Sequence, residues 1–404
     1  MAIIYLFMTI SEFAVPTVID RIGAKWSMTL GSIFYVFFLL GFLHLSAFLL
    51  YTLSALLGIG AALLWTASGV FLVEFSTDGQ LTRNSGILWA MIQASLIPGA
   101  VFLTFLLQNE DLVSSYRLLY SVFTGFALFA VFTFLLLSMR PKNTKTKKNI
   151  CQNFCIFQRV TESSLRRKTV VEDLLEIGRL MKSRKMGTLL VMFLYLGIES
   201  AFANGVYTGC LSATRRLTET NESVIAYAIF SIAFGHIIGA SLFGMFSTQT
   251  MKFGRKSIIG IGLICHLVAY TLCLLILPFE SPLANTWDKS IIEPRLILVL
   301  FTGFLLGFAG SCWHTQSLIM IGDLYKGPQL PSAIAIYRLC QSFAGVLVFL
   351  YSAHFALQWQ LGIASLFAII GYFVYHIVHQ WATKEFESKN EEIVRRCVIN
   401  EEIL

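Results

Sequence analysis

The chain has 404 residues, of which 56% are hydrophobic and only 13% are charged, and its net charge is +7. A soluble domain carries about 25% charged residues, because its surface must face water. This composition therefore excludes a soluble globular protein and indicates one whose main solvent is lipid.

Long apolar stretches follow one another along the chain, and polar residues gather in the short breaks between them. The stretches are about 18 to 25 residues long, the length of a helix that crosses a hydrocarbon core of about 30 Å. Barrel strands would instead alternate apolar and polar residues over about 10 positions. We therefore predict an all-α membrane protein with eleven spans, at residues 2–19, 27–50, 51–73, 85–107, 118–139, 187–211, 224–248, 258–278, 295–322, 332–353 and 359–382.

The first five spans form a predicted N-terminal bundle at residues 1–139. The first cation follows the first apolar run, which argues against a cleaved signal peptide. Glu12 lies inside that run, and an ionisable residue at membrane depth is costly enough to be a functional hypothesis by default. A hydrogen bond between helices is the alternative interpretation of Glu12.

A basic segment at residues 140–186 separates the two predicted bundles; it carries thirteen Lys or Arg and four acidic residues. Such segments are attracted to anionic lipid headgroups, which makes these headgroups a predicted partner besides the bilayer itself. Thr169 and Glu172 have the spacing of a capping box at a helix start. The helix can place Val170, Val171, Leu174, Leu175, Leu180 and Met181 on one apolar face. We predict an interfacial helix, with an ordinary solvated linker as the alternative.

Six further spans form a predicted C-terminal bundle at residues 187–383, followed by a tail at 384–404. Glu199 lies inside the first of these spans and is followed by Asn204 and Gly205, where a helix can loosen and expose backbone groups. A carboxylate in this setting suits proton coupling or a cationic ligand. A hydrogen bond that only packs two helices is the other interpretation.

Three more ionisable residues fall within the later spans. His236 and His314 are either site residues or interhelical hydrogen-bond partners. Arg338 lies about six residues into its span, so it either reaches back to the membrane surface or pairs with Glu199 in a cavity. Between the spans, Asn221 begins an Asn-Glu-Ser glycosylation sequon, which predicts a glycoprotein.

The distribution of Lys and Arg predicts the orientation. One side of the predicted membrane carries 24 of these residues and the other carries 5, with one more inside a span. The rule that cytosolic loops are the positive ones places the N-terminus outside or in a lumen and the C-terminus in the cytosol.

Features of the first bundle recur in the same order in the second, which indicates a duplicated bundle. The matched features are the stretches 56–60 and 305–309, the tryptophans Trp65 and Trp313, the acidic residues Glu74 and Asp323, the stretches 90–95 and 338–343, and the loops around Gly23 and Gly254. Parallel repeats of this kind are typical of the major facilitator architecture.

The stretches 56–66 and 83–90 closely resemble the Unc-93-like branch of the major facilitator superfamily, and 197–199, 204–207 and 359–361 resemble an orphan member of that branch. The resemblance covers nearly all of 1–383. It implies a fold of two pseudo-symmetric helical bundles with twelve spans, so residues 2–19 would correspond to the family's second helix and the first would be absent.

The resemblance also implies a conformational loop that latches the two halves, with Asp20, Arg21, Gly23 and Lys25 in the first copy and Gly254 and Arg255 in the second. Other positions of the motif differ, since Pro16, Ala24 and Met251 stand where the wider superfamily has Gly, Arg and Asp. These departures put a conventional transport cycle in doubt.

No catalytic motif, metal-ligand spacing, cofactor loop or nucleic-acid-binding pattern occurs in the sequence, so we expect no enzyme, no cofactor, no metal and no nucleic-acid partner. Two functions are open. The first is an orphan solute carrier that works by alternating access. The second, implied by the resemblance, is a non-transporting regulatory or trafficking subunit of a potassium channel or a receptor. The small number of polar groups in the spans favours a weakly polar substrate or the regulatory role.

Overall fold

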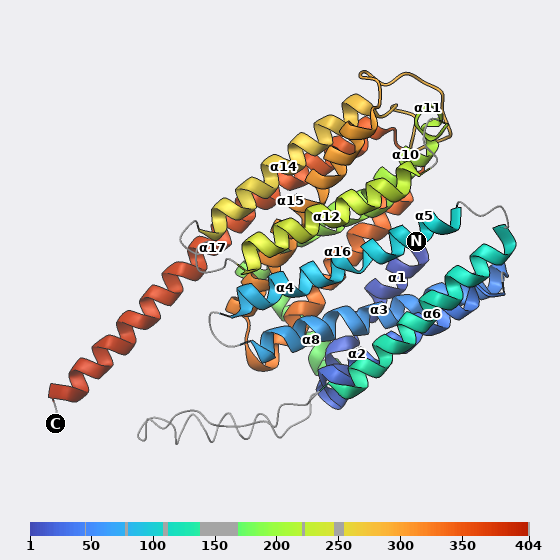
Figure 1. The fold of residues 1–404 in the computed structure, drawn as a ribbon. Helices are drawn as coiled ribbons and strands as arrows, with labels where there is room; N and C mark the ends of the chain where they lie inside the picture. Colours follow the sequence, from blue (N-terminus) through green and yellow to red (C-terminus); the bar gives the residue numbers. More distant parts are fainter. Residues whose placement is uncertain are drawn as a thin grey trace.

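The computed structural model describes residues 1–44, 46–76, 80–107, 112–137, 169–219, 223–245 and 254–402. Over this part of the chain the backbone is helical apart from its connections, and the only pairing of extended residues is an isolated bridge between Thr214 and Thr286. The prediction of an all-α protein is confirmed. Figure 1 shows the helices running along one common direction in two groups, α1 to α6 and α9 to α17.

The first group consists of α1 (Ala2–Ser11), α2 (Val15–Gly41), α3 (Ala47–Phe75), α4 (Leu81–Ala94), α5 (Leu96–Leu107) and α6 (Leu112–Leu136). The second contains α9 (Arg184–Ala201), η1 (Phe202–Val206), α10 (Tyr207–Ala213), α11 (Arg215–Thr218), α12 (Val224–Met245), α14 (Arg255–Ile276), α15 (Leu296–Leu324), η2 (Gly327–Gln329), α16 (Leu330–Tyr351) and α17 (Leu357–Glu402). The short helix α8 (Val170–Lys182) precedes this second group.

Nine helices of the described residues are long and apolar enough to cross a membrane. The predicted first span falls outside that set because it is divided: α1 ends at Ser11, and three turn residues precede α2. The predicted fourth span is divided at Ser95 into α4 and α5. The boundary between the second and third spans, predicted near residues 44–47, falls between the end of α2 at Gly41 and the start of α3 at Ala47.

Gly23 reverses the chain inside α2. Its φ of 84° is not helical, and the part of α2 after it runs antiparallel to α3, with Gly31 packed on Gly60 and Gly41 on Leu53. By contrast, α1 runs parallel to α3. Residues on the two sides of Gly23 therefore belong to separate passes through the bundle.

Gly254, the repeat counterpart of Gly23, has nearly the same backbone conformation, with φ 86°. It lies at the N-cap of α14. The two glycines thus turn the chain in the same way at corresponding places in the two halves. We call the end of the bundle at which they lie, together with α8, the Gly23 end.

Gly254→Ala is expected to lower the free energy of unfolding by about 1 to 3 kcal/mol, because a side chain is strained at this φ even though an added Cβ atom would meet nothing within 4 Å. Gly362→Ala is the matched control, since its Cβ atom also meets nothing but its φ is ordinary for a helix. The free energy of unfolding of this control should rise by up to about 1 kcal/mol. Thermal unfolding of the purified variants in detergent measures both, and equal effects would contradict the assigned role of the backbone.

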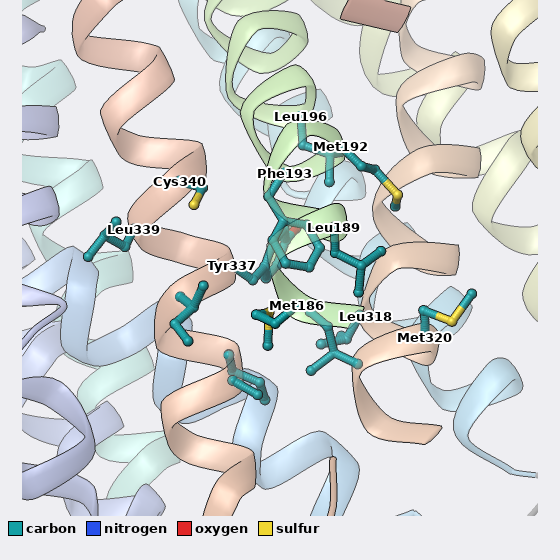
Figure 2. Close-up of a cluster of buried hydrophobic side chains, with 14 of the residues drawn as sticks. Met186, Leu189, Met192, Phe193, Leu196, Leu318, Met320, Tyr337, Leu339 and Cys340 are labelled. Atoms are coloured by element: carbon teal, nitrogen blue, oxygen red, sulfur yellow. The ribbon is translucent and has the colours of Figure 1, made fainter. Parts of the chain in front are cut away.

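The second half has a core of large apolar side chains from α9, α15 and α16. Figure 2 shows Met186, Leu189 and Phe193 of α9 packed against Leu318 and Tyr337. This cluster continues into α1 to α3 of the first half. The two halves therefore share one hydrophobic core at the Gly23 end.

The halves also meet helix against helix. Gly86 of α4 packs on Gly244 of α12, where an added Cβ atom would lie 2.3 Å from the Cα of Gly244. On the opposite side of the bundle, Thr9 of α1 donates a hydrogen bond of 2.9 Å to Ser342 of α16. The ring of Tyr5 lies against that of Phe349, with centroids 5.4 Å apart and the planes tilted by 50°.

The helix α8 begins with the predicted capping box, since Thr169 and Glu172 exchange side-chain to backbone hydrogen bonds. Its buried face differs from the predicted one, because Asp173 is buried and accepts a hydrogen bond of 2.5 Å from Thr17 of α2. Leu180 is buried as well, so the six predicted residues do not share one outer face. The ones that remain exposed are Val170, Val171, Leu174 and Leu175.

Three predictions concern segments beyond the bundle. Most of the basic segment, residues 140–168, lies outside the described residues, and so does Asn221 of the sequon. The segment predicted as a tail, 384–404, continues α17 as helix to Glu402. Figure 1 shows this end of α17 projecting beyond the other helices.

Candidate functional site

A cavity of about 290 Å³ lies between the two halves. Its main residues from the first half are Ile4, Tyr5, Met8, Tyr35, Trp65 and Trp89, and those from the second half are Glu199, Asn204, His236, His314, Arg338 and Gln341. Five of the six residues predicted for a site within the membrane therefore line one cavity. The exception is Glu12.

Two further cavities are formed by the second half alone. One of about 320 Å³ lies between η1, α10 and the loop around residues 281–285, and another of about 480 Å³ lies between α9, α16 and α17. The lining of the second is almost entirely apolar, with Tyr351 and His354 as its titratable side chains. The central cavity is the one that joins both halves and brings a carboxylate, imidazoles and a guanidinium together.

The two walls of the central cavity differ in chemistry. The first half supplies aromatic and aliphatic side chains from α1 to α4, among which Trp65 donates a hydrogen bond of 3.2 Å to the hydroxyl of Tyr35. The second half supplies most of the polar groups. Gln93 and Gln341, which are matched in the sequence repeat, both line the cavity.

Glu199 is the centre of a buried polar cluster. Its Oε2 lies 3.2 Å from Nε2 of His314 and accepts a 3.2 Å hydrogen bond from Ser200. Its Oε1 lies 3.8 Å from Nε2 of His266. Glu199 is only 2% exposed, so these neighbours replace the water that would otherwise solvate the carboxylate.

His266 is the site residue that the sequence reasoning missed. It lies on α14 and is fully buried, and its Nδ1 is 2.5 Å from the hydroxyl of Tyr195. It satisfies the criterion that singled out His236 and His314, an ionisable side chain within an apolar span, so the signal was present. The cluster around Glu199 thus extends away from the cavity to Tyr195.

The helix carrying Glu199 widens immediately after it. Residues Phe202–Val206 form the π-helix η1, within the region where the sequence indicated loosening, and Asn204 lies in its centre. The Asn204 side chain donates a 2.9 Å hydrogen bond to the carbonyl of Ser200. Single π-helical turns recur at functional sites because they re-aim side chains and free backbone groups.

Arg338 lies in the cavity wall and is only 6% exposed. The predicted reach to the membrane surface is therefore wrong, because the side chain folds over the rings of Trp65 and Tyr337, at 5.3 and 4.7 Å from their centroids. It donates a 2.8 Å hydrogen bond to Gln341, and its Nε has no partner among the described residues. The alternative ion pair with Glu199 is also absent among the described residues, where the close side-chain contacts of Glu199 are with His314, His266 and Ser200.

The remaining two membrane residues have simpler surroundings. His236 lines the cavity on α12, and its Nδ1 has no partner among the described residues. Glu12 is fully buried behind the cavity wall and accepts a 2.8 Å hydrogen bond from Thr66, while its Oε1 lacks a partner in the described part of the chain.

The residues predicted for a conformational loop lie at the Gly23 end. Arg255 forms an ion pair with Asp323 at the end of α15, and Lys25 lies over the ring of Trp26, 5.4 Å from its centroid. Asp20 and Arg21 are exposed just before Gly23. Within the described ranges, His, Cys, Asp and Glu form no group of three or more that could hold a metal ion.

Comparison with known proteins identifies relatives of this chain. The family model described as ion channel regulatory protein UNC-93 matches residues 1–376. The UNC93-like protein MFSD11 of Xenopus tropicalis is 28% identical over 389 residues, which cover 95% of this chain and 87% of that protein. Protein unc-93 homolog A of Mus musculus is 24% identical, covering 90% of this chain and 81% of that protein.

Two solved structures share the fold. The E. coli fucose:proton symporter FucP has a TM-score of 0.62 and 14% identity, covering 93% of this chain and 89% of its own. The proton:xylose symporter XylE of the major facilitator superfamily has the same TM-score and identity, covering 93% of this chain and 85% of its own. At this identity the likeness shows the fold alone, and it confirms the predicted major facilitator architecture.

Proposed function

From the premise that this chain belongs to the UNC-93 family and is a multi-pass membrane protein with the major facilitator fold, we propose that it is a solute carrier that works by alternating access. One observation carries the proposal: the cavity between the halves gathers a carboxylate, two imidazoles and a guanidinium at membrane depth. Such groups are expensive in a membrane and are retained where they bind or move a solute or a proton.

In this proposal Glu199 is the group that takes up and releases a proton. Its carboxylate lines the cavity, so a proton can reach it from there, and its histidine neighbours can accept or redistribute charge as it changes state. The chain Glu199, His266, Tyr195 then leads away from the cavity through contacts of 3.8 and 2.5 Å. The π-helical turn next to Glu199 gives the helix a place to change shape during the cycle.

Reconstitution tests the proposal. Vesicles containing the full chain, with an inwardly directed proton gradient, are expected to take up a member of a panel of small solutes, and Glu199→Gln is expected to reduce gradient-driven uptake at least tenfold. Glu280→Gln makes the same chemical change on an exposed loop and should leave uptake unchanged. Absence of flux for the whole panel would count against a carrier, and unchanged uptake by Glu199→Gln would remove the assigned role of the carboxylate.

The orientation follows from charge. We infer that the Gly23 end lies in the cytosol, because 24 of the Lys and Arg residues fall on that side and 5 on the other. The exposed apolar face of α8, with Val171 and Leu175, would then rest in the cytosolic headgroup region, where the basic residues of 140–186 attract anionic lipid. Glycosylation of Asn221 would mark the opposite side, and a shift of electrophoretic mobility on glycosidase treatment tests it.

A second function is favoured by the description of the matching family as an ion channel regulatory protein. In that case the chain would be a non-transporting partner of a potassium channel or a receptor. Affinity purification of the tagged chain from native membranes, followed by current recordings after its depletion, tests this. Recovery of a channel with an altered current, together with vesicles that show no uptake, would favour regulation over transport.

A further inference from the structure

We propose that the central cavity binds a small organic anion with a planar aromatic body, with Arg338 holding the anionic group. The inference rests on the proposed function only in calling this ligand the transported substrate. Binding itself depends on the cavity alone.

The charge of the cavity points to an anion. Arg338 is only 6% exposed, and its guanidinium has no ion pair within 4 Å among the described residues; the buried carboxylate of Glu12 acts on it only at longer range. Its Nε lacks any hydrogen-bond partner in the described part of the chain. The carboxylate of Glu199, by contrast, is already surrounded by His314, His266 and Ser200. A buried cation without a contacting anion is costly, and a ligand carboxylate would supply the contact and the hydrogen bond that Nε lacks.

The geometry of Arg338 suits a carboxylate in particular. A guanidinium offers donors in a fixed fork, which matches two oxygen atoms of a carboxylate. One terminal nitrogen is occupied by Gln341 at 2.8 Å, and the stacking of the group on Trp65 and Tyr337 holds its plane in place. The donor set is thereby oriented before a ligand arrives, which lowers the entropy that binding must overcome.

The cavity wall supplied by the first half determines which shape of ligand fits beside the anionic group. Tyr5, Tyr35, Trp65 and Trp89 line the first-half side, and Trp89 also lies against His314, with ring centroids 4.7 Å apart. Flat aromatic faces favour stacking with a planar ring. A polyol would instead need many hydrogen-bond donors and acceptors on both sides, and this wall supplies few. The cavity volume of about 290 Å³ lies at the small end of the range of ligand sites, about 300 to 1,000 Å³.

Binding to the purified full chain tests the inference without requiring transport. Four compounds separate the contributions of charge and ring: benzoate, benzamide and benzylamine, which are of similar size, and the smaller anion acetate, which lacks the ring. Quenching of tryptophan fluorescence and the shift in thermal unfolding temperature report binding, since Trp65 and Trp89 line the cavity. We expect benzoate to bind at least tenfold more tightly than each of the other three. Equal or tighter binding of benzamide or benzylamine would overturn the inference. This comparison uses the original protein, so it does not depend on whether a variant folds.

Two substitutions then locate the site. Arg338→Met is expected to weaken benzoate binding at least tenfold. Arg338→Lys keeps the positive charge but not the forked set of donors, so its affinity for benzoate should lie between those of the original protein and Arg338→Met. Trp89→Leu should weaken benzoate binding and leave acetate binding unchanged, because Trp89 lines the cavity and lies against His314, whereas Trp65 and Tyr337 are the rings under Arg338. Benzoate binding that survives Arg338→Met in folded protein would contradict the assignment.

The outcomes also separate this inference from the carrier proposal. Benzoate binding that depends on Arg338, without flux of any solute, would support the site and refute transport. Uptake of a neutral or cationic solute by a protein that does not bind benzoate would support transport and refute the anion site.

Discussion

Replacing Gly86 with valine is expected to abolish uptake while leaving both halves folded. Gly86 on α4 lies directly against Gly244 on α12, so a side chain here falls between the two halves. Its Cβ atom would lie 2.3 Å from the Cα of Gly244 and 2.6 Å from the carbonyl oxygen of Ala240. These are backbone atoms, which cannot move aside by changing rotamer, so α4 and α12 would be forced apart.

The separation should affect the cycle more than the fold, because each half keeps its internal packing. Alternating access requires the halves to close at one end while they open at the other, and Gly86 lies toward the Gly23 end. Gly99→Val on α5 is the matched control, since an added Cβ atom there meets nothing within 4 Å. It should leave both uptake and thermal stability close to those of the original protein.

A cysteine reporter makes the result independent of the substrate. In a chain without its eight native cysteines, Leu81→Cys places a thiol where Leu81 packs against Gly322 of the second half. Gly86→Val should raise the rate at which a membrane-impermeant maleimide labels this thiol from the Gly23 end, and Gly99→Val should not. Unchanged labelling together with full uptake would show that closure does not depend on this contact.

The helices could be predicted from sequence because backbone N–H and C=O groups in lipid must form hydrogen bonds within their own segment. An apolar stretch long enough to cross the membrane must therefore be helical, whatever it packs against. The predictions were less accurate where a helix breaks inside an apolar stretch. The break at Ser95 and the turn between α1 and α2 lie within apolar sequence. Each is followed by a proline, Pro16 in the first turn of α2 and Pro98 near the start of α5, and these prolines were the signal that the prediction missed.

The polar wall of the cavity was predictable for a similar reason. A charged group within an apolar span is rare, so Glu199 and Arg338 stood out, and the structure brings them to one cavity. Which way Arg338 turns was not predictable, because its direction depends on Trp65 and on the adjacent Tyr337. The position of Arg338 in its predicted span was compatible both with a side chain that reaches the membrane surface and with one that lines the cavity.

The aromatic wall could not be predicted at all. The chain has 7 Trp, 14 Tyr and 35 Phe, and most aromatic residues face lipid or a helix neighbour. Tyr5, Tyr35 and Trp89 differ from the rest only in facing the other half across the cavity. The position of these side chains at the cavity is set only when the two halves pack together, so no local sequence pattern indicates it.

The cluster around Glu199 should behave as one energetic unit. His314→Leu is expected to destabilise the protein by about 3 kcal/mol, because it removes the shorter of the two histidine contacts of a buried carboxylate and leaves it with His266 at 3.8 Å and with Ser200. Glu199→Met should cost less, about 1 kcal/mol, since His314 keeps Ser200 at 3.0 Å and the hydroxyl of Tyr337 at 3.1 Å.

The double variant, Glu199→Met with His314→Leu, should be no less stable than His314→Leu alone and is expected to recover about 2 kcal/mol, because an apolar pair carries no uncompensated charge. Thermal and denaturant unfolding of the four proteins in detergent measure the coupling. The ion pair of Arg255 and Asp323 is the matched control: its side chains are 27% and 44% exposed, so water screens it and its coupling should be at most about 1 kcal/mol. Additive losses at Glu199 and His314 would mean that the two side chains merely occupy the same region, and the histidine could then not tune a proton site on Glu199.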